Sequence, residues 1–214
     1  MITQIGADVY SFERSLPHWE EADHRIANSL QLLSALVRLR ARSGQVTDPR
    51  TFLLEIADRI ETVGKLHRFL ADSATGTVQL AEYLEEICDR LTGALAPAAT
   101  SVTLDCPVDC PLPAKTALSL ALISAELVSN SLKYAHPAGL PTKITLSCRL
   151  DQKGDLTIVY EDDGVGFPDG FDINETGHMG MNLIRLLGKG VGGAHEWHSD
   201  PLGIRFEMRL PINS

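Results

Sequence analysis

The sequence predicts an α+β protein in which an N-terminal antiparallel helical hairpin precedes an α/β sandwich with a mixed sheet. Apolar residues recur every three or four positions between about residues 17 and 72, as they do in amphipathic helices. From about residue 78, helical and strand-like segments interleave, and the closely spaced strands indicate antiparallel neighbours. One of these strands ends in the acidic and glycine-rich run 161–166, which is the most informative stretch of the chain.

Composition limits the classes of function. The chain has 214 residues, of which 44% are hydrophobic and 6% aromatic, and this suits one ordinary domain or two small ones. A net charge of −9 argues against nucleic acid as a partner. The chain start lacks a secretory signal and no apolar run is long enough to span a bilayer, so we expect a cytoplasmic protein without membrane insertion. Four cysteines without a CxxC pair are expected to be reduced, buried thiols.

The N-terminal third of the chain is predicted to be an arm followed by a helical hairpin. Residues 1–16 form an arm, and the hairpin occupies 17–73. Its first helix begins near Pro17 and ends at Ser43-Gly44, and Asp48-Pro49 begins the second with a capping residue and a proline. The apolar stripes are Ile26, Leu30, Leu33 and Val37 in the first helix, and Phe52, Ile56, Ile60, Val63, His67 and Leu70 in the second. Because one hairpin cannot bury both stripes, we expect two chains to form a four-helix bundle, and therefore a homodimer.

A small, polar segment at about residues 73–77 is the predicted domain boundary, and 78–214 form the second domain. The predicted helices lie at about 79–95, 114–135 and 181–187. The predicted strands lie at about 101–106, 143–150, 156–161, 195–198 and 205–210, and Pro107, Pro111 and Pro113 form an irregular link.

The run 161–166 follows a β-branched strand and contains Asp162, Gly164 and Gly166. A carboxylate at a strand end can accept a hydrogen bond from an exocyclic amine such as that of adenine, and the glycines allow close approach of the backbone. A polar turn after a strand fits these six residues equally well, so the flanking segments decide.

The long helix before this motif carries Glu126, Asn130 and Lys133 on one face, because their spacing is i, i+4 and i+7. An asparagine oxygen suits Mg²⁺ that is held mainly by phosphates, and a lysine can meet a phosphate. An ordinary solvated face is the alternative. Beyond the motif, Gly177 and Gly180 open a helix whose free N–H groups would seat a phosphate, and residues 167–176 would form a mobile cover.

In this order, the three groups of residues resemble the N, G1 and G2 boxes of the Bergerat-type ATP-binding domain of histidine kinases, gyrase-type ATPases and heat-shock chaperones. The hairpin selects among them, because residues 23–31, DHRIANSLQ, resemble the phosphoacceptor box H-R-x-x-N-x-L-Q of HisKA-type-2 histidine kinases, which are related to the HWE kinases. Asp48-Pro49, the run 59–67 and the run 133–137 also match, so the likeness covers about residues 18–211.

The resemblance implies ATP and Mg²⁺ as cofactors. It makes His24 the phosphorylated residue, with Asp23 and Arg25 as its catalytic neighbours, although Glu20 and Glu21 are also within reach of the imidazole. Asn130 becomes the Mg²⁺ ligand, and Asp162 the carboxylate that recognises adenine. The remaining nucleotide-binding residues would be Glu126, Lys133, Gly164, Gly166, Gly177 and Gly180.

The chain departs from this family at Ala27 and Ser29, where basic or amide residues are usual, and at Gly203-Ile204, where a Gly-Thr pair is usual. We expect a histidine kinase core that autophosphorylates on His24 and passes the phosphoryl group to an aspartate of a response regulator. A separate sensor protein would supply the signal, since no sensor domain precedes the hairpin. The main alternative is a histidine phosphotransfer protein with a vestigial ATP site. A serine kinase or ATPase of the same fold is a weaker one.

Overall fold

The computed structural model describes residues 48–71, 77–95, 99–106, 110–173 and 179–212, together with parts of 26–38. The chain divides into two compact units, Met1–Gly76 and Thr77–Ser214, and each is described by itself.

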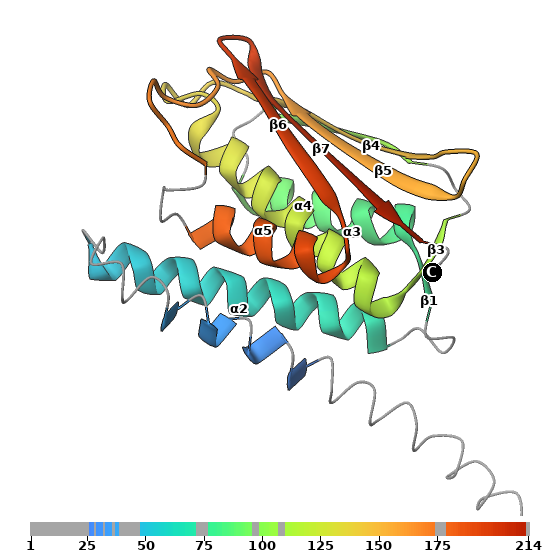
Figure 1. The fold of residues 1–214 in the computed structure, drawn as a ribbon. Coiled ribbons are helices and arrows are strands. Elements are labelled where there is room, and N and C mark those ends of the chain that lie inside the picture. The colour runs from blue at the N-terminus through green and yellow to red at the C-terminus, as the bar shows by residue number, and fades with distance from the viewer. Residues whose placement is uncertain are drawn as a thin grey trace, which may run out of the picture. The chain divides into compact units, whose positions relative to one another are not determined.

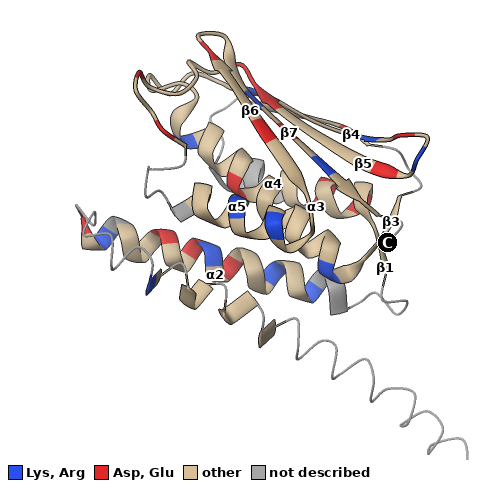
Figure 2. Ribbon diagram, in the orientation of Figure 1, with Lys and Arg blue, Asp and Glu red and all other residues tan. Residues whose placement is uncertain are grey.

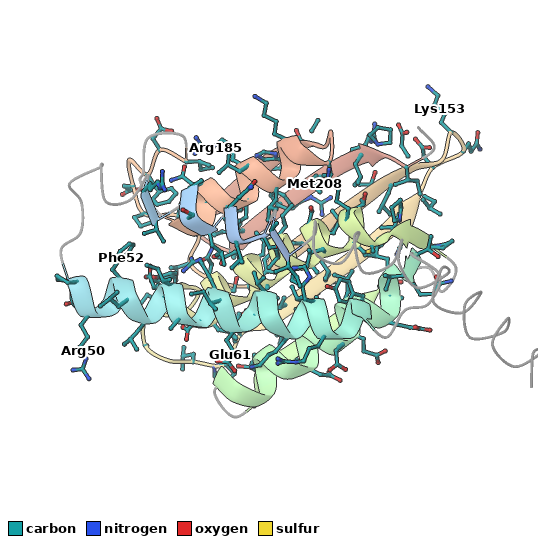
Figure 3. The ribbon with its side chains drawn as sticks, turned by 90° about the horizontal axis from the view of Figure 1, so that it is seen from below. Arg50, Phe52, Glu61, Lys153, Arg185 and Met208 are labelled. Carbon is teal, nitrogen blue, oxygen red and sulfur yellow. The ribbon has the colours of Figure 1, made fainter. Side chains whose placement is uncertain are left out.

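In the first unit, the described residues between 26 and 38 are helical, and α2 spans Pro49–Ala71. Asp48 caps α2, because its carboxylate accepts the Arg50 N–H at 3.0 Å and its carbonyl accepts the Phe52 N–H at 3.1 Å. Figure 3 labels Arg50 and Phe52 near the start of this helix and Glu61 near its middle. Ser29 Oγ and His67 Nε2 are hydrogen-bonded at 3.0 Å, which joins the first helical segment to α2.

The apolar residues of the first unit divide into buried and exposed groups. Leu33, Val63 and Leu66 are buried. Leu53 and Ile60 on α2 remain 64% and 52% exposed, while both signs of charge are distributed along the same helix (Figure 2). The exposed apolar side chains are those that an additional surface would have to cover.

The second unit is built on a five-stranded sheet with the order β2-β4-β5-β7-β6 (Figure 1). The strands are β2 (Ser101–Asp105), β4 (Lys143–Leu150), β5 (Asp155–Asp162), β6 (Ala194–Asp200) and β7 (Gly203–Pro211). Strand β2 pairs with β4 in parallel, and the other three pairings are antiparallel. The predicted mixed sheet is therefore confirmed.

Three helices, α3 (Leu80–Leu95), α4 (Ala114–Tyr134) and α5 (Met179–Gly190), lie on one face of this sheet (Figure 1). Alternate residues of β5, including Leu156, Ile158 and Tyr160, are buried beneath them, as expected for a sheet with one covered face. Helix α4 is buried continuously from Leu120 to Val128, which places it at the centre of the core. The helical layer on a mixed sheet gives the predicted α+β sandwich.

The structure has a second, two-stranded sheet that was not predicted from the sequence. Strands β1 (Thr77–Gln79) and β3 (Pro111–Pro113) pair antiparallel, although the proline-rich segment was expected to be an irregular link. Proline is tolerated in a two-stranded ribbon because each strand has an unpaired edge. Val78 and Leu112 are buried, so the ribbon adds to the core beside α4.

Some predicted boundaries were too narrow. Helix α5 begins at Met179 and continues to Gly190, and β6 extends from Ala194 to Asp200. The chain turns between them through Gly193, where a Cβ atom would lie 3.1 Å from the sulfur of Met208 on β7. Figure 3 labels this Met208 and Arg185 of α5.

The cysteines are all free thiols, as expected. Cys88, Cys110 and Cys148 are buried, but Cys106 is partly exposed, so the expectation of four buried thiols was wrong for that residue. Cys106 directly follows the edge strand β2, where cover from neighbouring elements is incomplete. In the described parts of the chain, no helix has the length and apolar character needed to cross a bilayer.

Candidate functional site

Asp162, the last residue of β5, is buried and held from three directions. Its Oδ1 accepts the Gly164 N–H at 3.0 Å and the Ile204 N–H at 3.2 Å. Its Oδ2 accepts a short hydrogen bond from the Ser131 hydroxyl. The donors come from the motif loop, β7 and α4, so the carboxylate has one fixed orientation.

A second row of polar groups lies behind this carboxylate. The phenol oxygen of Tyr160 is 2.6 Å from Ser131 Oγ and 3.1 Å from the Leu127 carbonyl oxygen. Burial raises the pKa of Tyr160 well above its ordinary value, so the phenol is protonated. Tyr160 and Asp162 lie on the same face of β5 because they are two residues apart.

Neither Ser131 nor Tyr160 is among the site residues predicted from the sequence. Ser131 directly follows Asn130, and Tyr160 precedes the motif by one residue, so both stood beside predicted site residues. Their roles depend on the packing of α4 against β5, which no local pattern shows.

Three glycines permit the close contacts around Asp162. A Cβ atom on Gly164 would lie 2.6 Å from atoms of Ala135. Gly166 has φ of +74°, and its Cβ would lie 2.3 Å from the Asp200 carbonyl oxygen. Gly203 has φ of +139°, and its Cβ would lie 1.8 Å from the Asp162 carbonyl oxygen. These glycines are needed for packing within the protein, and the predicted contact of Gly164 and Gly166 with a nucleotide stays a prediction.

The motif loop is also fastened to the C-terminal end of α4. Val165 donates its N–H to the Ala135 carbonyl at 2.9 Å. The Asp163 carboxylate accepts the Lys143 N–H at 2.8 Å and lies 3.2 Å from His136 Nε2. Burial alone would raise the pKa of Asp163, but the Lys143 and His136 contacts outweigh it and hold that pKa below its ordinary value.

The three predicted residues of α4 become more accessible along the helix. Glu126 is buried, Asn130 is half-buried and Lys133 is exposed. Since Ser131 contacts Asp162, the adjacent Asn130 lies at the same end of the site. No cluster of three His, Cys, Asp or Glu side chains able to hold a metal occurs among the described residues. A single amide oxygen fits Mg²⁺ whose other ligands are phosphates and water.

The first part of the predicted cover is attached to β6. Phe167 donates its N–H to Ser199 Oγ at 2.7 Å and stacks on Phe171 with ring centroids 4.6 Å apart. Its ring is also 5.7 Å from that of Trp197. Arg185 on α5 donates to the Ile173 carbonyl at 3.2 Å. The segment from Phe167 to Ile173 is thus bonded to both β6 and α5.

Of the remaining predicted site residues, the structure describes only Gly180. Gly180 is buried in the first turn of α5. Asp23, His24, Arg25 and Gly177 lie outside the described residues, so their assignments stay predictions.

The second unit is an α/β sandwich with a buried carboxylate at a strand end, and it follows a separate helical unit in the chain. A family model described as "Histidine kinase" (HisKA_2) matches residues 21–95. A second one, described as "Histidine kinase-, DNA gyrase B-, and HSP90-like ATPase" (HATPase_c), matches residues 116–214. The chain belongs to the histidine kinase family whose cores join these two modules.

Curated relatives of this chain are also named as histidine kinases. The sensor histidine kinase PdtaS of Mycobacterium tuberculosis is 29% identical over 171 residues, which are 78% of this chain and 33% of the relative. The blue-light-activated histidine kinase 2 of Erythrobacter litoralis is 25% identical over 203 residues, which are 90% of this chain and 56% of the relative. The chain therefore spans about a third to a half of the length of these relatives.

Solved structures share the fold. The histidine kinase domain of a blue-light activated histidine kinase from Erythrobacter litoralis has a TM-score of 0.65 at 21% identity and covers 86% of this chain and 96% of that domain. A second structure, of the blue-light activated histidine kinase from Erythrobacter litoralis, has a TM-score of 0.74 at 21% identity. The match covers 92% of this chain and 63% of the chain in that structure.

Proposed function

We propose that this chain is the ATP-dependent core of a protein histidine kinase. It phosphorylates His24 with Mg-ATP and passes the phosphoryl group to an aspartate of a response regulator. The observation that carries the proposal is the buried Asp162 carboxylate, fixed by Ser131, Gly164 and Ile204 at the end of β5. Membership of the family supports the same reaction.

The donors around Asp162 explain how it recognises adenine. A carboxylate that receives hydrogen bonds from a hydroxyl and two backbone N–H groups is stabilised as an acceptor. The exocyclic amine of adenine is a donor, so it complements this carboxylate. Because the oxygen atoms are already oriented, little conformational entropy is lost when the base binds.

The phosphate end of the site is assigned to α4 and α5. Asn130 supplies one oxygen ligand to Mg²⁺, and Lys133 supplies a positive charge for the phosphates. The first turn of α5, with Gly180 buried inside it, provides N–H groups at a helix start. Phosphoryl transfer needs chiefly positioning and charge neutralisation, and His24 supplies a neutral imidazole nitrogen as the nucleophile.

The unusual Gly203-Ile204 pair does not remove the carboxylate's support. Ile204 contributes its backbone N–H to Asp162, which any residue except proline would supply. Gly203 fits closely against the Asp162 carbonyl. Both observations favour a working nucleotide site over the vestigial site of a phosphotransfer protein.

We further propose that the first unit forms the dimer and the phosphotransfer domain, occupying 17–73, and that 78–214 is the catalytic domain. The partners are a second copy of the chain and a receiver domain, and the site of action is the cytoplasm. Exposed Leu53 and Ile60 support the dimer because they offer an uncovered apolar surface on α2.

The test uses the purified chain, γ-labelled ATP and Mg²⁺. Label should enter the protein, resist base and be lost in acid, as expected for a phosphoramidate, and His24→Ala should abolish incorporation while keeping nucleotide binding. Calorimetry that finds no Mg-ATP binding at millimolar nucleotide, together with phosphorylation of His24 by a phosphorylated receiver, would contradict the kinase and support the relay.

A further inference from the structure

Two thiols lie side by side at the edge of the sheet. Cys106 follows β2 and Cys148 belongs to β4, and the parallel register places Asp105 opposite Ser147. Continuing that register by one residue brings Cys106 beside Cys148, and each thiol shifts the pKa of the other. Neighbouring strands are about 4.8 Å apart, which lies within the Cα separation that a disulfide requires.

The two thiols differ in access. Cys106 is partly exposed, whereas Cys148 has no exposed surface. Arg149 adjoins Cys148, and its guanidinium is paired with the Asp105 carboxylate. One thiol is thus within reach of a small solute beside a cationic group, while its partner is protected.

The contact between the two thiols and the nearby charges shift the pKa values of Cys106 and Cys148 in opposite directions. The hydrogen bond from Cys148 lowers the pKa of Cys106, with Arg149 contributing in the same direction, while burial and the Asp105 carboxylate oppose the shift. The pKa of Cys148 is raised, first because its S–H donates to Cys106 and then because it is buried. Cys106 is therefore the thiol that forms the reactive thiolate.

We propose that Cys106 and Cys148 are a redox modification site, at which a hydroperoxide converts the two thiols into a reversible intrachain disulfide. Cys106 is the attacking residue and Cys148 the resolving residue. The site belongs to the second unit and is independent of His24 and of the nucleotide residues.

The chemistry is balanced in two steps. The Cys106 thiolate attacks the O–O bond of the hydroperoxide, and with one proton this forms Cys106 sulfenic acid and an alcohol, or water from hydrogen peroxide. The Cys148 sulfur then displaces the sulfenic hydroxyl, which leaves with the Cys148 proton as water. Two thiols lose two electrons and two protons in total, and the hydroperoxide is reduced. A dithiol restores both thiols by exchange.

The link would act on the outer strand of the sheet. Strand β2 has β4 as its only neighbour in the described five-stranded sheet. A covalent bond to β4 closes the chain between residues 106 and 148, which contains α4. Oxidation should therefore raise the midpoint of thermal unfolding of the second unit.

The other two cysteines differ in ways that make them controls. Burial raises the pKa of Cys88 to about 11, so its thiolate is scarce near neutral pH. Cys110 is buried just before β3 and donates its N–H to Gln79 Oε1 at 3.1 Å. Neither follows β2, and the strand register pairs neither with Cys148, although Cys110 lies near enough to Cys148 to help raise its pKa.

The experiment exposes the folded full-length chain to hydrogen peroxide, blocks remaining thiols after denaturation, and counts them. Two of the four thiols should be lost, and dithiothreitol should restore them. Mass spectrometry of non-reduced peptides should find Cys106 joined to Cys148. Cleavage before aspartate is needed, because Asp109 then separates Cys106 from Cys110. In the Cys106→Ser variant, hydrogen peroxide should leave the three remaining thiols reduced. In the Cys88→Ala variant, the disulfide between Cys106 and Cys148 should still form.

Peptide mapping of the unaltered chain keeps the test decisive if a variant does not fold. A disulfide that includes Cys88 or Cys110 would overturn the proposal. So would a Cys106 that proceeds to sulfinic acid with Cys148 still reduced, or a link that forms only after denaturation.

Discussion

The hydroxyl oxygens of Tyr160 and Ser131 lie 2.6 Å apart inside the second unit, and Ser131 in turn donates to Asp162. A tyrosine on β5 therefore supports the serine on α4 that orients the site carboxylate. Tyr160 is fully buried and also contacts the Leu127 carbonyl, so the phenol links the sheet to the helix that carries Asn130.

Replacing Tyr160 by phenylalanine should lower the free energy of unfolding by about 1 kcal/mol, since one buried hydrogen-bonding group is lost while the ring remains. ATP should still bind, because Ser131 keeps its bond to Asp162. Urea denaturation and calorimetry measure the two effects. Tyr134→Phe, at a residue that is 62% exposed, is the control and should cost clearly less stability. Equal losses in both variants would contradict the network.

Asp162→Asn should abolish measurable ATP binding. The new amide would direct an N–H₂ group toward one of the present donors or toward the adenine amine, and either arrangement leaves buried donors unpaired. The matched control is Asp163→Asn, because Asp163 is the adjacent carboxylate but contacts Lys143 and His136. Calorimetry should find binding in the control only, with both proteins folded by circular dichroism. Retained binding in Asp162→Asn would refute the assignment.

Gly203→Ala should destabilise the second unit by at least about 2 kcal/mol, because its Cβ would overlap the Asp162 carbonyl oxygen and its positive φ disfavours alanine. Gly190→Ala provides the comparison, since no described atom beyond its chain neighbours and its own helix backbone lies within 4 Å of its Cβ position. Chemical denaturation should separate the two variants clearly. A Gly203→Ala protein as stable as Gly190→Ala would show that β7 can shift away from Asp162.

Ile60→Asp should convert a dimer into a monomer, because Ile60 is the exposed apolar side chain at the middle of α2. Leu33 is a poorer test because it is already buried within the chain, and a charge there would disturb the folded unit itself. Glu61→Gln, on the neighbouring exposed position, should leave the assembly unchanged. Light scattering gives the molar mass. A monodisperse monomer of the unaltered chain would contradict the four-helix bundle.

Stability should fall as the solution becomes acidic, in part through His195. Burial and the nearby Arg185 hold the pKa of His195 below its usual value of 6.5. The unfolded chain then binds the proton more readily, so this contribution is complete above about pH 6.5 and is lost as pH falls through the folded-state pKa. His195→Gln should flatten the pH dependence of unfolding, as measured by chemical denaturation. Identical profiles for His195→Gln and the unaltered chain would contradict this.

Much of the second unit could be predicted because its local patterns agree with its structure. The alternation in β5 and the long apolar run of α4 marked a buried strand and helix, and Asp162 at the strand end marked the site. The features that could not be predicted depend on contacts between segments that are far apart in the sequence. The β1–β3 ribbon joins residues about 34 positions apart. Ser131 and Ile204 meet Asp162, and Tyr160 meets Ser131, only through tertiary packing. The pairing of Cys106 with Cys148 likewise depends on strand register, which composition does not reveal.

For the proposed adenine site, the way Asp162 is held also predicts which bases would be rejected. A carboxylate has about four lone-pair directions, and three accept hydrogen bonds from the described residues. One direction on Oδ2 is left, so a purine meets a single acceptor there. Adenine presents an amine at its sixth ring position, whereas guanine presents a carbonyl, whose oxygen would face a negatively charged oxygen without a proton between them. Discrimination between ATP and GTP thus follows from a count of lone pairs.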